Sequence, residues 1–189
     1  MKNPVTKLLA SLVALLCLLA PPAMAWEMDG VKTLSVLTRD QQLIAIGTVE
    51  FTPMPNGAAG FKLTMDHKRF TDHFLSMKEF KCLEGGDEVL CHVAYPYRTP
   101  GIVSKRDYAW LEHSLLFLFK QPRDFGAKLW NGLYYRLEQD KDGLVGYPQA
   151  VDLNLISAPP DDLTIPPYDK SLRDDVAPGS HWIERLVIR

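Results

Sequence analysis

The stretch KCLEGGDEVLCH, residues 81–92, places an apolar segment on each side of a Gly-Gly-Asp turn. A glycine followed by an aspartate is a favoured two-residue hairpin loop, so Gly86 and Asp87 are predicted to form the turn. Counting outward from this turn places Cys82 opposite Cys91 in a non-hydrogen-bonded pair, whose Cα atoms lie about 4.5 Å apart. A disulfide tolerates that separation. The stretch therefore predicts a β-hairpin closed by a Cys82–Cys91 disulfide.

Two other roles for this cysteine pair are less consistent with the sequence. A zinc site needs four ligands, and His92 would point to the opposite face of the strand from Cys91. A redox couple usually has two residues between its cysteines, whereas eight lie between these. No metal site is therefore assigned. A structural disulfide needs an oxidising compartment, which makes the N-terminus informative.

Residues 1–25 have the order of a secretory signal peptide. Two lysines precede the apolar run 8–20, which is shorter than the ~20 residues that span a bilayer. The sequence Ala-Met-Ala at 23–25 is typical of a signal peptidase site. We expect cleavage before Trp26, loss of Cys17 with the signal, and export to the periplasm or the medium, with no membrane span in the remaining chain.

The composition excludes one class of partner. The chain of 189 residues has 21 basic and 23 acidic residues, dispersed along its length, and a formal net charge of −2. Because nonspecific nucleic-acid binding depends on clustered positive charge, a nucleic-acid partner is not expected. The length predicts a single domain over residues 26–189 with a substantial core.

Strand patterns dominate this domain. Alternation of Phe61, Leu63 and Met65 with polar residues is typical of a half-buried strand. Seven segments have comparable strand character: 33–37, 43–51, 61–66, 80–83, 89–95, 133–139 and 144–156. The hairpin is expected to place one set of side chains on a shared face: Phe80, Cys82, Val89, Cys91, Val93 and Tyr95.

One helix is predicted near residues 105–120. Ser104 followed by Asp107 resembles a capping box, and apolar residues follow at helical spacing until Pro122. The run LLFLF at 115–119 also fits a strand. Residues 157–180 are proline-rich and are expected to form an extended tail that docks back onto the body. The fold class predicted is mainly β (β-rich α+β), an antiparallel β-barrel or sandwich of about seven short strands with one helix.

The segment directly after the hairpin is a candidate binding corner. Tyr95, Tyr97 and Arg98 surround a proline, so two phenols and a guanidinium are held on a restricted backbone. Such a group suits a small anionic or sugar-like ligand, or a partner protein of the envelope. The alternative is that the tyrosine rings pack on the core.

A second candidate is the near-repeat Asp66-His67 and Asp72-His73. The histidines share a face only if the stretch is extended, and a metal site would need a third converging ligand. The alternative is local pairing of each histidine with an acid. His67 and His73 are retained as ligand-binding candidates, whereas His113 and His181 are expected to be structural.

No diagnostic catalytic motif is present. No serine lies in a Gly-X-Ser-X-Gly context, and none of the 23 acids is distinguished by its surroundings. No catalytic residue or cofactor is assigned. The expected function is that of a soluble exported small-ligand-binding or accessory protein without catalysis of its own. The alternatives are a small exported hydrolase using the Asp/His cluster at 66–73, and an envelope protein-interaction module.

Overall fold

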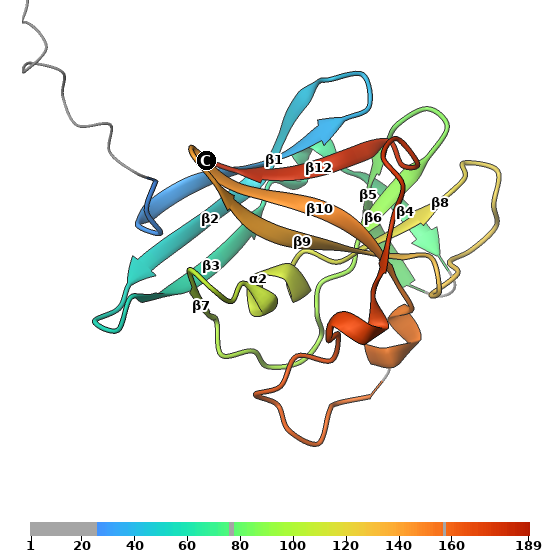
Figure 1. The fold of residues 1–189 in the computed structure, drawn as a ribbon. Coiled ribbons are helices and arrows are strands. Elements are labelled where there is room, and N and C mark those ends of the chain that lie inside the picture. The colour runs from blue at the N-terminus through green and yellow to red at the C-terminus, as the bar shows by residue number, and fades with distance from the viewer. Residues whose placement is uncertain (1–25, 76–77, 157) are drawn as a thin grey trace, which may run out of the picture.

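The computed structural model describes residues 26–75, 78–156 and 158–189 (Figure 1). The predicted signal peptide, 1–25, lies outside them. The strands are β1 (Gly30–Thr38), β2 (Leu43–Pro53), β3 (Ala58–Met65), β4 (Thr71–Leu75), β5 (Lys78–Glu84), β6 (Val89–His92), β7 (Ile102–Ser104), β8 (Phe117–Lys120), β9 (Gly132–Asp140), β10 (Gly143–Val151), β11 (Asp174–Asp175) and β12 (Ile183–Ile188). The helices of this part are α2 (Ala109–His113) and the 3₁₀ helices His67–Arg69, Leu153–Ile156 and Lys170–Leu172.

The described strands form one antiparallel sheet. Its order is β4-β5-β6-β8-β9-β10-β12-β1-β2-β3-β7, and β11 pairs with β10. The sheet curves (Figure 1). Helix α2 contacts β9, which lies in the middle of the sheet, and also β7, which is the last strand at one end of the sheet. Because β4 and β7 are the two ends of the order, the sheet is an open one. The prediction of a mainly β antiparallel fold is confirmed, but the sheet is neither a closed barrel nor a two-sheet sandwich.

The number of strands also differs from the prediction. Each of the seven predicted segments contains a strand, but β6 ends at His92 and the last segment continues into the 3₁₀ helix Leu153–Ile156. The described residues contain five further strands: β4, β7, β8, β11 and β12. β7 and β11 have only three and two residues, too few to show a periodic pattern. No strand was predicted over β12, which follows the expected tail 157–180. It lies between β1 and β10 in the middle of the sheet.

The prediction of a helix near residues 105–120 was wrong in extent. The helix is the single short α2, and residues 117–120 form β8, which pairs with both β6 and β9. An extended chain sends Phe117 into one apolar cluster and Leu118 into the other. A helix would offer no backbone groups to the two flanking strands, so sheet pairing overrides the helical spacing.

The hairpin follows the predicted register. Cys82 pairs with Cys91 across β5 and β6, their Cα atoms lie 3.9 Å apart, and the disulfide is formed. The Gly85 N–H donates to the Glu88 carbonyl at 2.8 Å, and Gly86 has a φ of 79°, which favours glycine. A side chain at Gly85 would overlap the indole of Trp182, so the turn packs directly against the start of β12.

Apolar side chains form two clusters, one on each face of the sheet. The first contains residues of β1, β2, β9 and β12 together with Leu111 and Leu115 from the α2 region. The second surrounds the disulfide and includes Tyr134, Val151 and Tyr168. The predicted shared face of the hairpin is confirmed, since all six of its side chains belong to this second cluster. Each fully buried large apolar side chain stabilises the fold by about 1.5–3 kcal/mol.

The segment after β10 runs over the second cluster and returns to the sheet as β11 and β12 (Figure 1). Tyr168 in this segment is 2% exposed, and its hydroxyl donates to the Asp152 carbonyl at 2.9 Å. In the described part of the chain, no helix has the length and apolar character needed to cross a bilayer.

Candidate functional site

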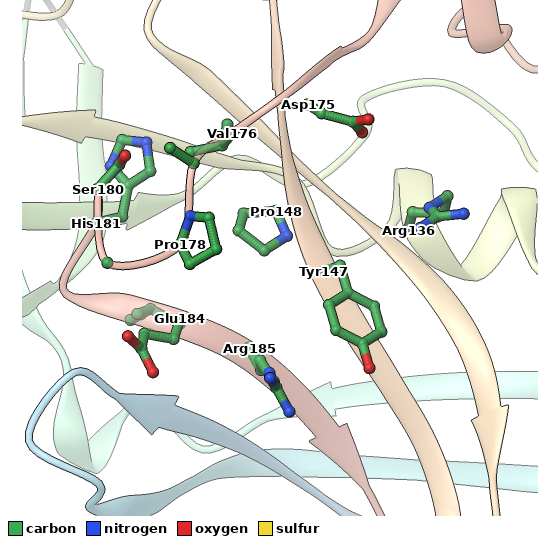
Figure 2. A pocket seen from close by; sticks show the side chains of 13 residues that line it. Arg136, Tyr147, Pro148, Asp175, Val176, Pro178, Ser180, His181, Glu184 and Arg185 are labelled. Atoms are coloured by element: carbon green, nitrogen blue, oxygen red, sulfur yellow. The ribbon is translucent and has the colours of Figure 1, made fainter.

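A cleft of about 370 Å³ lies beside β10 and β12, and Figure 2 shows its lining residues. β10 pairs with β12 only from Leu144 to Gly146. Pro148 follows, and because proline has no backbone N–H it cannot extend this ladder. The next residues of β10 pair with β11 instead. The strands therefore separate, and residues 175–181 border the opening.

Tyr147, an aromatic residue of this cleft, has an arginine on each of the two neighbouring strands. Tyr147 is paired with Arg136 in the register of β9 and β10. On its other side, the Arg185 guanidinium carbon lies 5.2 Å from the centre of the Tyr147 ring, a cation–π contact (Figure 2). Three neighbouring strands thus contribute a row of two cations and one ring.

The two arginines differ in what holds them. Arg136 forms an ion pair of 2.8 Å with Glu138, and both side chains are about half exposed (47% and 48%). Such a surface pair contributes at most about 1 kcal/mol and is easily exchanged for another acceptor. Within the described residues, the Arg185 side chain has no hydrogen bond or ion pair, and its guanidinium lies against the Tyr147 ring. Its five N–H donors are therefore available to a ligand.

The acids of the cleft already accept hydrogen bonds from amides. The Gln149 side chain donates to Asp175 at 2.7 Å, and the Gln41 side chain donates to Glu184 at 3.3 Å. The remaining wall is largely apolar and is formed by Tyr147, Pro148, Val176, Ala177, Pro178 and Ile183. An apolar wall with a few polar groups is the usual composition of a small-molecule site.

The corner proposed from the sequence divides into buried and exposed parts. Tyr95 packs among rings, with centroid distances of 5.6 Å to Tyr97, 5.9 Å to Trp110 and 6.0 Å to His113. Its hydroxyl is buried without a hydrogen-bond partner in the described residues, and burial raises its pKa. Arg98 is exposed. The tyrosines therefore act as packing groups here, whereas Arg98 faces solvent.

The two candidate histidines have different neighbours. His67 is exposed in a 3₁₀ helix, with its ring against Phe70 at 5.5 Å. His73 lies on β4 and forms a 3.0 Å contact with Glu84 of β5. Neither pairs with the aspartate beside it in the sequence: Asp72 binds Lys81, and Asp66 caps the 3₁₀ helix through the Lys68 N–H. In the described residues, no three His, Cys, Asp or Glu side chains gather as a metal site would require.

Buried polar groups of α2 lie beneath the corner. His113 is fully buried, with Nδ1 2.6 Å from the Ala109 carbonyl and Nε2 3.1 Å from the Tyr168 N–H. Because a backbone N–H can only donate, Nε2 accepts and Nδ1 carries the proton. Burial lowers the pKa of His113 to about 4. This histidine is therefore neutral and links α2 to the tail.

Glu112, the neighbouring residue, is also buried and fully engaged. Its carboxylate accepts from the Tyr134 hydroxyl and from the Leu137 N–H at 2.6 Å. Burial raises the pKa of Glu112, and burial together with the adjacent carboxylate raises that of Tyr134. The Arg173 guanidinium lies 4.6 Å from the centre of the Tyr134 ring. The arrangement joins α2, β9 and the tail and leaves no open position for a substrate among these groups.

Sequence reasoning did not identify Arg136, Tyr147 or Arg185 as site residues. Arg136 and Tyr147 lie in segments that were predicted to be strands, whereas no strand was predicted over β12, which contains Arg185. What alternation does not provide is the pairing of strands. Arg185 is far from Tyr147 in the chain, and only the placement of β12 beside β10 brings them together.

Comparisons with protein-family models, with curated proteins and with solved structures find no match to this chain.

Proposed function

We propose that this protein is an exported binding or accessory protein that holds a small anionic, sugar-like ligand in the cleft beside β10 and β12. The observation that carries the proposal is Arg185, a guanidinium against an aromatic ring with no acidic partner in the described residues. A carboxylate on the ligand would accept two parallel hydrogen bonds from this group, which is the geometry that arginine favours.

The other walls suit a sugar ring. Tyr147 and Pro178 offer flat apolar surfaces, while Ser180 and Asp175 offer polar atoms at the rim. The volume of about 370 Å³ lies near the lower end of the range for small-molecule sites, which suits a monosaccharide or a disaccharide. A uronic acid combines the two features, a ring and a carboxylate. The Cys82–Cys91 disulfide is compatible with export.

The test is calorimetric titration of the purified protein with glucuronate, galacturonate and neutral glucose. We expect binding of at least one uronate, weaker binding of glucose, and a loss of at least tenfold in affinity for Arg185→Ala, since a charge-assisted hydrogen bond contributes about 1.5–3 kcal/mol. Native mass spectrometry of protein from its own compartment would identify a retained ligand.

Arg98→Ala is the matched control, because Arg98 is also exposed and lies at the corner proposed from the sequence. It should leave uronate binding unchanged. Loss of binding in Arg98→Ala with retention in Arg185→Ala would transfer the site to the corner. An absence of binding by any acidic sugar, and of any retained anion, would reject the proposal.

A further inference from the structure

A second cleft, of about 410 Å³, lies on the other side of the segment that borders the first. It is formed by the β5–β6 turn, the end of β8, the loop at 121–131 and residues 180–182. Ser180 and His181 line both clefts. The second cleft has a different chemistry, because most of its lining residues are charged or polar.

Two of its acids already have cationic or N–H partners. Asp87 forms an ion pair of 2.7 Å with Arg39. The nearly buried Glu88 contacts His181 Nδ1 at 2.7 Å and accepts from the Trp182 N–H at 2.7 Å. These pairs hold the hairpin turn against the start of β12.

Two lysines of the cleft have no acidic partner in the described residues. Lys120 is only 6% exposed, and its one hydrogen bond runs to the Pro122 carbonyl at 3.5 Å. Lys128 is exposed, and its side chain has no ion pair or hydrogen bond with the part of the chain that the structure describes. Asp124, the remaining acid, accepts from the Gln121 N–H at 3.3 Å and closes the turn after β8.

The buried Lys120 ammonium lacks a counter-ion among the described residues. An ammonium group has three donors, whereas the Lys120 ammonium has one acceptor among the described residues, the Pro122 carbonyl, and burying a charge with so few partners is costly. Lys120 lies opposite Val89 in the β6–β8 register, so its stem packs on apolar surface of the second cluster while its charge lacks a counter-ion. An anion in the cleft would supply the missing acceptors.

We propose that this second cleft binds a small molecule bearing a phosphate group, held by Lys120 and Lys128. A phosphate carries up to two negative charges near pH 7 and three acceptor oxygens, which matches two ammonium groups better than a single carboxylate does. The site is independent of the acidic-sugar cleft, since neither lysine lines that cleft.

The test is titration of the full chain with inorganic phosphate, and separately with acetate, by calorimetry at low ionic strength. We expect phosphate to bind at one site and acetate to bind at least tenfold more weakly. Lys120→Met should weaken phosphate binding at least tenfold, Lys120→Arg should retain it, and Lys128→Met should weaken it severalfold. Lys141→Met, an exposed lysine of the β9–β10 turn that lines neither cleft, should have no effect.

Equal binding of acetate and phosphate, equal losses in Lys120→Met and Lys141→Met, or no phosphate binding at all would overturn the proposal. If Lys120→Met fails to fold, the exposed Lys128→Met carries the test. Arg185→Ala should leave phosphate binding intact, so the two sites succeed or fail separately.

Discussion

At the scale of single residues, His113 is informative because its hydrogen-bond partners determine its protonation state. His113 accepts a hydrogen bond from the Tyr168 N–H, so protonation would break that bond and bury a charge. Its pKa of about 4, against an ordinary value of 6.5, expresses this cost. Arg185 illustrates the opposite case, because it is exposed and its charge lacks an acidic partner among the described residues.

The first prediction concerns the pH dependence of stability through His113. Between pH 6.5 and 4 the unfolded chain binds a proton that the folded chain does not, so this contribution is complete above pH 6.5 and declines as the pH falls. The raised pKa of Glu112 acts in the opposite direction, so the wild type alone does not isolate the effect. We expect the stability difference between wild type and His113→Asn to be about 2–3 kcal/mol smaller at pH 4.5 than at pH 7.5.

Urea unfolding at the two pH values measures this difference. The exposed His67→Asn is the control and should show the same small difference from wild type at both. A His113→Asn difference that does not change with pH would mean that the residue titrates normally.

At the scale of elements, the turn residues determine the β5–β6 hairpin, whereas pairing with distant strands determines β8. The β5–β6 hairpin follows its own turn, so its register could be counted from the sequence. β8 could not be assigned in this way, because LLFLF is compatible with helix and strand and the outcome depends on β6 and β9 on either side. Pairing partners decide the state of a short apolar segment more strongly than its own spacing does.

The second prediction concerns the stability that the disulfide gives to this hairpin. Replacing both cysteines, Cys82→Ala with Cys91→Ala, should lower the free energy of unfolding by about 2.5–3 kcal/mol, since the bond closes a ten-residue loop in the unfolded chain. Urea unfolding measures the loss. A reducing agent should destabilise the wild type by a similar amount and leave the double variant unaffected. Equal sensitivity of both proteins to the reducing agent would contradict the assignment.

At the scale of the whole molecule, both ends of the described region 26–189 are held to the body. Trp26 packs on the first cluster with its ring centre 6.0 Å from that of Phe51. The last residues of the chain pair with β1 and β10 in the centre of the sheet. Both ends of the region 26–189 are therefore tied to the body by packing or by strand pairing.

The third prediction is that the exported protein begins at Trp26, within two residues. N-terminal sequencing of protein recovered from the periplasm or the medium measures this directly. Replacing Ala23 and Ala25 together with aspartate should block cleavage and retain the longer chain, because signal peptidase requires small residues at these positions. Recovery of native protein that still begins with Met1 would show that residues 1–25 are not a cleaved signal.

The sequence by itself determined the features that depend on neighbours in the chain: the turn at Gly86, the Cys82–Cys91 pairing and the mainly β character. Only the tertiary structure decided which strands meet. The row Arg136, Tyr147 and Arg185 exists because β12 inserts between β1 and β10 and because Pro148 stops its pairing with β10. The physical reason is that hydrogen bonds between strands are the same for any sequence, so partners are selected by the burial of side chains across the whole sheet.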